Sequence, residues 1–192
     1  MATTVDLPNR TLHPGELYLA RSPTLLLTIL GSCVAVTFWS ARLGAGAMCH
    51  GVLPRWRESY GGRAGVDDHR YVDLSIQFLA NQFDALGAAR QEVEVKLFGG
   101  ADVLPVMASR AHILTVGALN CRAALEVLQQ EGFCVAASDL RGVRGRRIHF
   151  HTGTGEVMVH RLASWVRLEA QPDDEGSRSA SSRPRLVSGT YE

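Results

Sequence analysis

The sequence lacks the signals of several common protein classes. Its four cysteines include no CxxC pair, so a zinc ribbon or a thioredoxin-type motif has no support. The longest apolar run, residues 24–36, is interrupted by Gly-Ser-Cys and is too short to span a bilayer. The first 15 residues have no apolar core of a secretory signal. We therefore expect a cytoplasmic protein whose thiols stay reduced.

An excess of charge of either sign is also missing. The chain has 20 Lys and Arg against 19 Asp and Glu, which gives a formal net charge of +1. This balance offers no electrostatic reason to expect nucleic acid or an anionic membrane as the main partner. With 192 residues, 46% of them hydrophobic, the chain is long enough to bury the core of one domain.

The hydrophobic pattern predicts an α+β domain between two less regular ends. Residues 1–15 are interpreted as an irregular arm, residues 16–168 as the folded domain, and the polar residues 169–192 as a disordered tail. Strands are predicted at 24–30, 34–39, 44–53, 93–98, 133–137, 147–151 and 157–162. Helices are predicted at 71–86 and 118–131, the second with Leu119, Ala123, Leu125 and Leu128 on one face. A regular βαβ alternation is absent, so a mixed sheet is favoured over a doubly wound one.

Cys33 lies at a break between two apolar strands, directly after Gly31 and Ser32. A sharp turn at the end of a strand can lift a nucleophile clear of the sheet. Such a turn also leaves backbone N–H groups free for a developing oxyanion, here those of Ser32, Cys33 and Val34. The alternative is that Cys33 is a small buried hydrophobic residue, as free cysteines often are.

His50 is the candidate base for this thiol. If residues 34–39 and 44–53 form a hairpin that turns between Ala41 and Arg42, Cys33 and His50 face each other with β-carbons about 5 Å apart. An imidazolium there would lower the pKa of the thiol, and the same ring could protonate a departing amine. A longer loop ending near Gly44 would change the register, and a slip of one residue would separate the pair. The alternative for His50 is a strand histidine bonded to a backbone carbonyl, whereas neighbouring Cys49 is expected in the core.

A third group should orient the imidazole ring. Thr28, on the strand that leads to Cys33, is one candidate, and Asp68, Asp73 and Asn81 are the others.

Glycines and histidines elsewhere offer weaker candidates. Gly99 and Gly100 are interpreted as a tight turn beside the active site, because they lack the spacing of a phosphate or dinucleotide loop. His149 and His151 share a strand face but have no third ligand at a suitable spacing, so no metal site and no cofactor is predicted. The arginines between 141 and 147 are interpreted mainly as a solvated edge.

Several motifs occur in an order that resembles the CheD family of chemoreceptor glutamine deamidases. They are TILGSCVAV (28–36), MCHGVLP (48–54), YVD (71–73), KLFGGA (96–101), VGALN (116–120), GRRIHF (145–150) and TGEVMV (154–159). The resemblance runs from about residue 15 to 162. Two positions depart from the family pattern: Arg141 precedes Gly142 where Gly-Gly is usual, and Cys49 replaces a smaller residue.

The resemblance implies a fold and a reaction. The fold would be a mixed β core flanked by helices, similar to the cytotoxic necrotizing factor deamidases. Cys33 would attack a receptor glutamine to give a thioester, with His50 as base and then acid and Thr28 as its orienting group. From the position of the two turns, we expect Ser32, Val34, Gly99 and Gly100 to line the oxyanion or substrate site. The expected partners are methyl-accepting chemotaxis receptors and a CheC-type phosphatase. The resemblance also allows weak methylesterase action on receptor glutamate esters. The alternatives are a non-catalytic adaptor that binds receptor or CheC, and a small-molecule amidase.

Overall fold

The fold was analysed in a computed structural model, which describes residues 7–56, 68–102, 115–163 and 185–186. Ten strands in these ranges form two mixed sheets. The first sheet has the order β1-β3-β8-β9-β10 and the second the order β2-β5-β4-β6-β7. The strands of the first sheet are β1 (Asn9–Thr11), β3 (Leu25–Leu30), β8 (Arg146–His151), β9 (Val157–Arg161) and β10 (Arg185–Leu186). Those of the second are β2 (Leu17–Ala20), β5 (Ala45–Gly51), β4 (Val34–Ser40), β6 (Glu94–Gly99) and β7 (Val135–Leu140).

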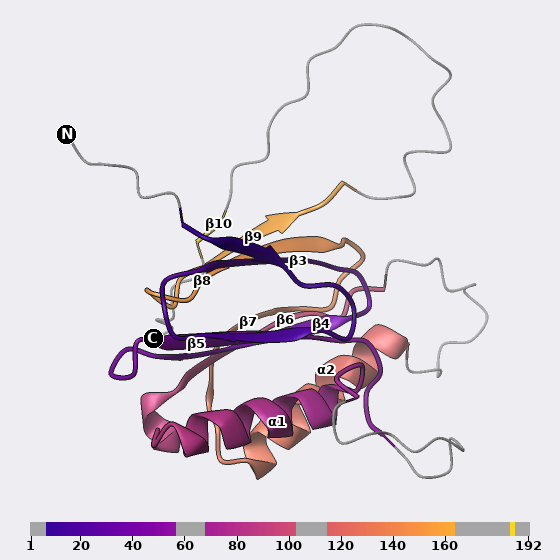
Figure 1. The fold of residues 1–192 in the computed structure, drawn as a ribbon. Helices are drawn as coiled ribbons and strands as arrows, with labels where there is room; N and C mark the ends of the chain where they lie inside the picture. Colours follow the sequence, from indigo (N-terminus) through magenta and orange to yellow (C-terminus); the bar gives the residue numbers. More distant parts are fainter. Residues whose placement is uncertain (1–6, 57–67, 103–114, 164–184, 187–192) are drawn as a thin grey trace, which may run out of the picture.

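The two sheets and a pair of helices form three layers (Figure 1). Helices α1 (Val72–Ala85) and α2 (Val116–Gln130) cover the face of the second sheet that points away from the first sheet. Alternate residues of β4 therefore enter two different cores, as the period of a strand requires. Val36 and Phe38 pack on the helices, whereas Ala35 joins Leu26 and Phe150 between the sheets.

The predicted α+β class is confirmed, and both predicted helices form within two residues of their expected ends. The face predicted for the second helix is partly wrong, because Ala123 and Leu128 are buried but Leu125 is 44% exposed. The segment predicted as an irregular arm contains β1, which pairs in parallel with β3. Strand β2 was not predicted. Most of the predicted tail lies outside the described residues, but β10 within it pairs with β9.

The arginine-rich edge also differs from expectation at one position. Arg146, on the first sheet, is 2% exposed and forms an ion pair of 2.7 Å with Asp139 on the second sheet. Asp139 also pairs with Arg161, at 2.9 Å. A buried charge needs such a partner, so Arg146 joins the two sheets instead of facing solvent.

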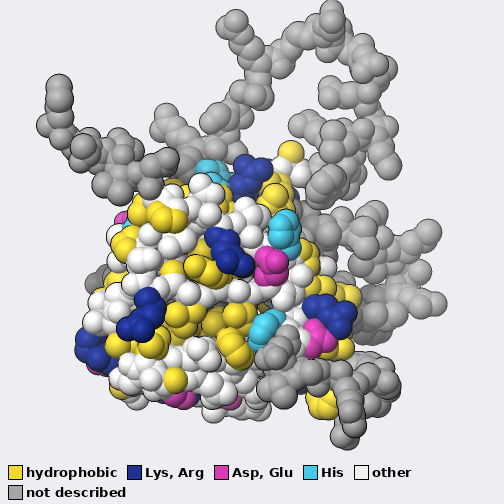
Figure 2. Space-filling model, in the orientation of Figure 1, with side chains coloured by type: hydrophobic (Ala, Val, Ile, Leu, Met, Phe, Trp, Pro, Cys, Tyr) yellow, Lys and Arg dark blue, Asp and Glu magenta, His cyan; other side chains and the backbone are white. Residues whose placement is uncertain are grey.

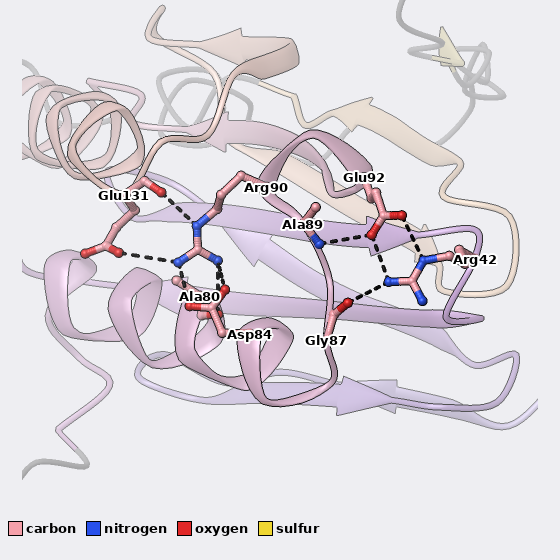
Figure 3. A network of polar contacts seen from close by, with 8 residues as sticks. All are labelled: Arg42, Ala80, Asp84, Gly87, Ala89, Arg90, Glu92 and Glu131. Carbon is pink, nitrogen blue, oxygen red and sulfur yellow. Dashed lines mark hydrogen bonds and ion pairs between the residues drawn. The ribbon is translucent and has the colours of Figure 1, made fainter.

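Charged networks on the surface fasten the connection from α1 to β6. Arg90, in the 3-10 turn η2 (Arg90–Glu92), binds Asp84 and the carbonyl of Glu131, while Arg42 binds Glu92 and the carbonyl of Gly87 (Figure 3). Acidic and basic side chains are interspersed with hydrophobic ones on the face seen in Figure 2. No helix among the described residues is long and apolar enough to cross a membrane.

Candidate active site

The Gly31-Ser32-Cys33 bend carries the chain from one sheet to the other. Strand β3 ends at Leu30 in the first sheet, and β4 begins at Val34 in the second. Two carbonyls of the bend are held from outside: Ala101 N–H donates to Gly31 O and Gly100 N–H to Cys33 O, both at 2.8 Å. The bend is thus fixed by backbone hydrogen bonds, which gives Cys33 a defined position at the end of the sandwich.

Gly99 and Gly100 support this bend from behind. A β-carbon on Gly99 would lie 2.3 Å from the Cys33 carbonyl oxygen, and one on Gly100 would lie 2.1 Å from the sulfur of Cys121. Both residues have positive φ, of 111° and 67°, a region that glycine enters without strain. Because the Gly100 N–H is bonded to Cys33 O, it is not available to an oxyanion. This pair therefore acts on the site through the backbone of the bend.

The Cys33 side chain is partly exposed and packs against the cluster of residues between the two sheets. Burial raises the pKa of its thiol, and its own backbone N–H acts in the opposite direction. Cys49 is buried among the helices, and its pKa is raised to about 12 by desolvation. The expectation that Cys49 belongs to the core is therefore confirmed.

The predicted pairing of Cys33 directly opposite His50 is wrong. Strand β5 pairs with β4 so that His50 faces Ala35, because the turn spans residues 41–44 and Gly44 takes a positive φ of 57°. The register differs from the predicted one by two residues, which keeps the same face. Cys33, two residues before Ala35, is thus diagonal to His50, a relation of about 7–8 Å between α-carbons in a regular sheet.

Thr28 reaches His50 from the other sheet. Its hydroxyl donates to the Leu12 carbonyl at 2.9 Å, and its oxygen lies 2.8 Å from Nδ1 of His50. Since the hydroxyl proton is used on Leu12, the oxygen accepts from Nδ1–H, which fixes the tautomer. Nε2 then carries the free lone pair, and this atom has no partner among the described residues. An unprotonated nitrogen held in this way has the properties of a general base.

Burial also sets the charge of the imidazole. His50 is 2% exposed, and desolvation lowers the pKa of its ring. The pKa of Cys33 is shifted upward at the same time. A neutral thiol and a neutral imidazole are therefore favoured at rest, in contrast to the thiolate–imidazolium pair considered from the sequence.

The other candidates for the orienting group are engaged elsewhere. Asp68 pairs with Arg70 at 2.7 Å, and Asp73 accepts from the backbone N–H groups of Trp56 and Leu74. Asn81 is on the exposed face of α1. Thr28 is therefore the candidate that the fold brings to the ring.

One buried polar residue at the site was missed by the sequence reasoning. Asn120 on α2 donates from Nδ2 to the carbonyls of Ser32 and Val52, at 3.0 and 2.9 Å. A signal for it was present, because Asn120 has helical spacing to the buried residues Ala124 and Val127. A polar residue on an otherwise apolar helix face marks a specific hydrogen-bonding task.

The fold and the site together define a class of protein: an α+β sandwich that presents a cysteine and a hydroxyl-oriented histidine at one end. A family model described as CheD chemotactic sensory transduction matches residues 52–161. The chain belongs to the CheD family. The matched range begins after Cys33 and His50, so it does not depend on the two candidate catalytic residues.

Curated relatives extend the similarity over most of the chain. The probable chemoreceptor glutamine deamidase CheD 2 of Geobacter sulfurreducens is 44% identical over 156 residues, which cover 81% of this chain and 91% of the relative. The probable chemoreceptor glutamine deamidase CheD of Oleidesulfovibrio alaskensis is 37% identical, covering 92% and 84%. The protein of the same description from Pseudomonas savastanoi pv. phaseolicola is 35% identical, covering 98% and 99%.

Proposed function

We propose that this protein deamidates glutamine side chains of methyl-accepting chemotaxis receptors, with Cys33 as nucleophile and His50 as base. The relatives' descriptions as chemoreceptor glutamine deamidases support the substrate and the reaction. The observation that carries the residue assignment is the bond from His50 Nδ1 to Thr28, which leaves Nε2 unprotonated on a residue that lies diagonal to Cys33 across the β4–β5 pairing.

The first half of the reaction forms a thioester. The sulfur of Cys33 attacks the carbonyl carbon of the glutamine amide while Nε2 of His50 takes the thiol proton. Backbone N–H groups of the bend stabilise the negative charge that develops on the amide oxygen. As the tetrahedral intermediate collapses, His50 returns the proton to the nitrogen, and ammonia leaves.

The second half restores the enzyme. A water molecule gives one proton to His50 and attacks the thioester carbon, and the C–S bond breaks as the carbonyl reforms. The products are a glutamate side chain and the Cys33 thiol, which regains its proton from His50. The same route would hydrolyse a glutamate methyl ester, because both substrates pass through one thioester.

The proposal includes finer features of fold and partners. We take the sandwich with its Cys-His site to be related to the cytotoxic necrotizing factor deamidases. We also propose a cytoplasmic location, where receptor signalling helices and a CheC-type phosphatase would be met. A non-catalytic adaptor is disfavoured, because an adaptor has no need of a partly exposed thiol beside an oriented imidazole.

The test is a mass measurement on a purified receptor cytoplasmic fragment. Wild-type protein should convert receptor glutamines to glutamates and release ammonia, whereas Cys33→Ala should release none and still bind the fragment. Cys134→Ala, which removes an exposed cysteine, is the matched control and should keep full activity. Normal turnover by the Cys33→Ala protein would remove Cys33 from the mechanism.

A further inference from the structure

Asn120 connects the two chain segments that carry Cys33 and His50. The residue is fully buried on α2, and its Nδ2 donates to Ser32 O at 3.0 Å and to Val52 O at 2.9 Å. Ser32 immediately precedes the nucleophile, and Val52 follows His50 by two residues. One side-chain amide therefore binds both segments.

The orientation of this amide is determined by its partners. Both are carbonyl oxygens, which only accept hydrogen bonds, so the NH₂ group must face them. The Oδ1 atom is buried and has no partner within the described part of the chain. An unpaired buried acceptor costs free energy, and the residue is thus used here for its two donors.

The bond to Ser32 sets the direction of the Cys33 N–H. In a trans peptide the carbonyl of one residue and the N–H of the next point in opposite directions, and no cis peptide occurs among the described residues. With Ser32 O turned to α2, the Cys33 N–H points away from the helix. Burial raises the pKa of the Cys33 thiol, and the Cys33 N–H acts in the opposite direction.

The same rule separates the other oxyanion candidates. Gly31 O is held by Ala101 N–H, so the Ser32 N–H points away from Ala101. Cys33 O is held by Gly100 N–H, and the Val34 N–H therefore turns the opposite way, toward its pairing partner Gly51 on β5. Of the three candidates, Ser32 and Cys33 thus keep N–H groups that are not directed into the β4–β5 pairing.

We propose that Asn120 is a positioning residue, whose amide clamps Ser32 O and Val52 O so that the Cys33 N–H faces the reacting carbonyl. The inference rests on the proposed deamidation for its kinetic readout, but its effect on the thiol can be measured without any substrate. Asn120 has no contact with substrate in this arrangement, so its loss acts on kcat and leaves KM nearly unchanged.

The test compares Asn120→Ala and Asn120→Leu with wild type. Leucine has nearly the shape of asparagine and keeps the space filled if alanine does not fold. Removing one oxyanion donor costs about 10²–10³-fold in kcat, and a donor that is only misaligned should cost about 10–100-fold. The pH midpoint for alkylation of Cys33 by iodoacetamide, read by peptide mass spectrometry, should rise. The control is Thr152→Ala, which removes a buried side chain bonded to Ser22 and Thr24 at the other end of β3 and should change neither quantity.

The outcomes separate the two proposals. A folded Asn120 variant with the wild-type alkylation midpoint and kcat overturns the positioning role. A fall in kcat that only matches the unfolded fraction, measured by circular dichroism, also overturns it. If wild type fails to deamidate receptor but the variants still shift the alkylation midpoint, the proposed function fails and the role of Asn120 stands.

Discussion

The Thr28→Val substitution is the sharpest probe of how the two sheets build the site. Valine has the shape of threonine without its hydroxyl, and Thr28 is 1% exposed, so packing is largely preserved. The change removes the bonds to Leu12 O and His50 Nδ1. Each group that loses its hydroxyl partner costs up to about 1–3 kcal/mol. The two costs do not add in full, because the Leu12 carbonyl also interacts with the His50 ring and raises its pKa. We expect the free energy of unfolding to fall by about 2–4 kcal/mol.

The effect on catalysis follows from the tautomer. A hydrogen bond contributes about 0.5–1.5 kcal/mol net, and each 1.36 kcal/mol is about tenfold in rate. Without the hydroxyl acceptor, the His50 ring is held less firmly with its proton on Nδ1, and protonation at Nε2 would remove the function as base that we propose for it. The kcat for receptor deamidation should therefore fall about tenfold, with KM unchanged.

The assay is steady-state ammonia release, together with ¹⁵N chemical shifts of the His50 ring nitrogens. Thr24→Val is the matched control, because it removes a buried hydroxyl that donates to Ser22 O at 3.1 Å before the start of β3. It should lose some stability but keep kcat and the ring shifts. If Thr28→Val keeps the wild-type kcat and an Nδ1-protonated ring, the orienting role of Thr28 is refuted.

Two further predictions concern stability. Burial lowers the pKa of His50, so below about pH 6.5 the ring is protonated in the unfolded chain before it is protonated in the folded protein. The free energy of unfolding, measured with urea, should therefore fall on acidification. It should fall less steeply in the His50→Gln protein. An equal slope for both proteins would exclude His50 as the source. Arg141 has a φ of 64° and pairs with Asp102 at 3.1 Å. The free energy of unfolding, measured with urea, should be about 1 kcal/mol higher for Arg141→Gly than for Arg141→Ala, because only glycine adopts the left-handed backbone without strain. The reverse order would show that this strain is absent.

The local part of the fold could be predicted from the sequence, because it depends on neighbours along the chain. The helix at 72–85 follows from apolar residues at helical spacing and ends before Gly87, whose φ is 75°. Arg141 has a positive φ at the position where the resemblance described above leads one to expect glycine. Turn length was harder: the four-residue turn 41–44 moved the β4–β5 register by two residues.

The non-local part could not be predicted. Strands β3 and β4 are separated by three residues, yet they belong to different sheets. No periodicity distinguishes this from a hairpin, because β4 is an apolar run that is buried on both faces and shows no alternation. Thr28 could therefore be named as a candidate, but its contact with His50 depends on how two sheets pack. Asn120 was missed for the same reason, since its partners lie 88 and 68 residues away along the chain.

Because the bend joins the two sheets, the rate of enzymatic turnover should depend on how tightly the two layers pack against each other. His50 lies on one layer and its hydroxyl partner Thr28 on the other. A compact state that keeps its strands but loosens the contact between the layers would therefore lose the bond that fixes the His50 tautomer before it loses secondary structure. During gentle denaturation, deamidation should disappear ahead of the far-ultraviolet signal. A stabilising change anywhere in the Arg146–Asp139 linkage between the layers would delay that loss without touching the chemistry.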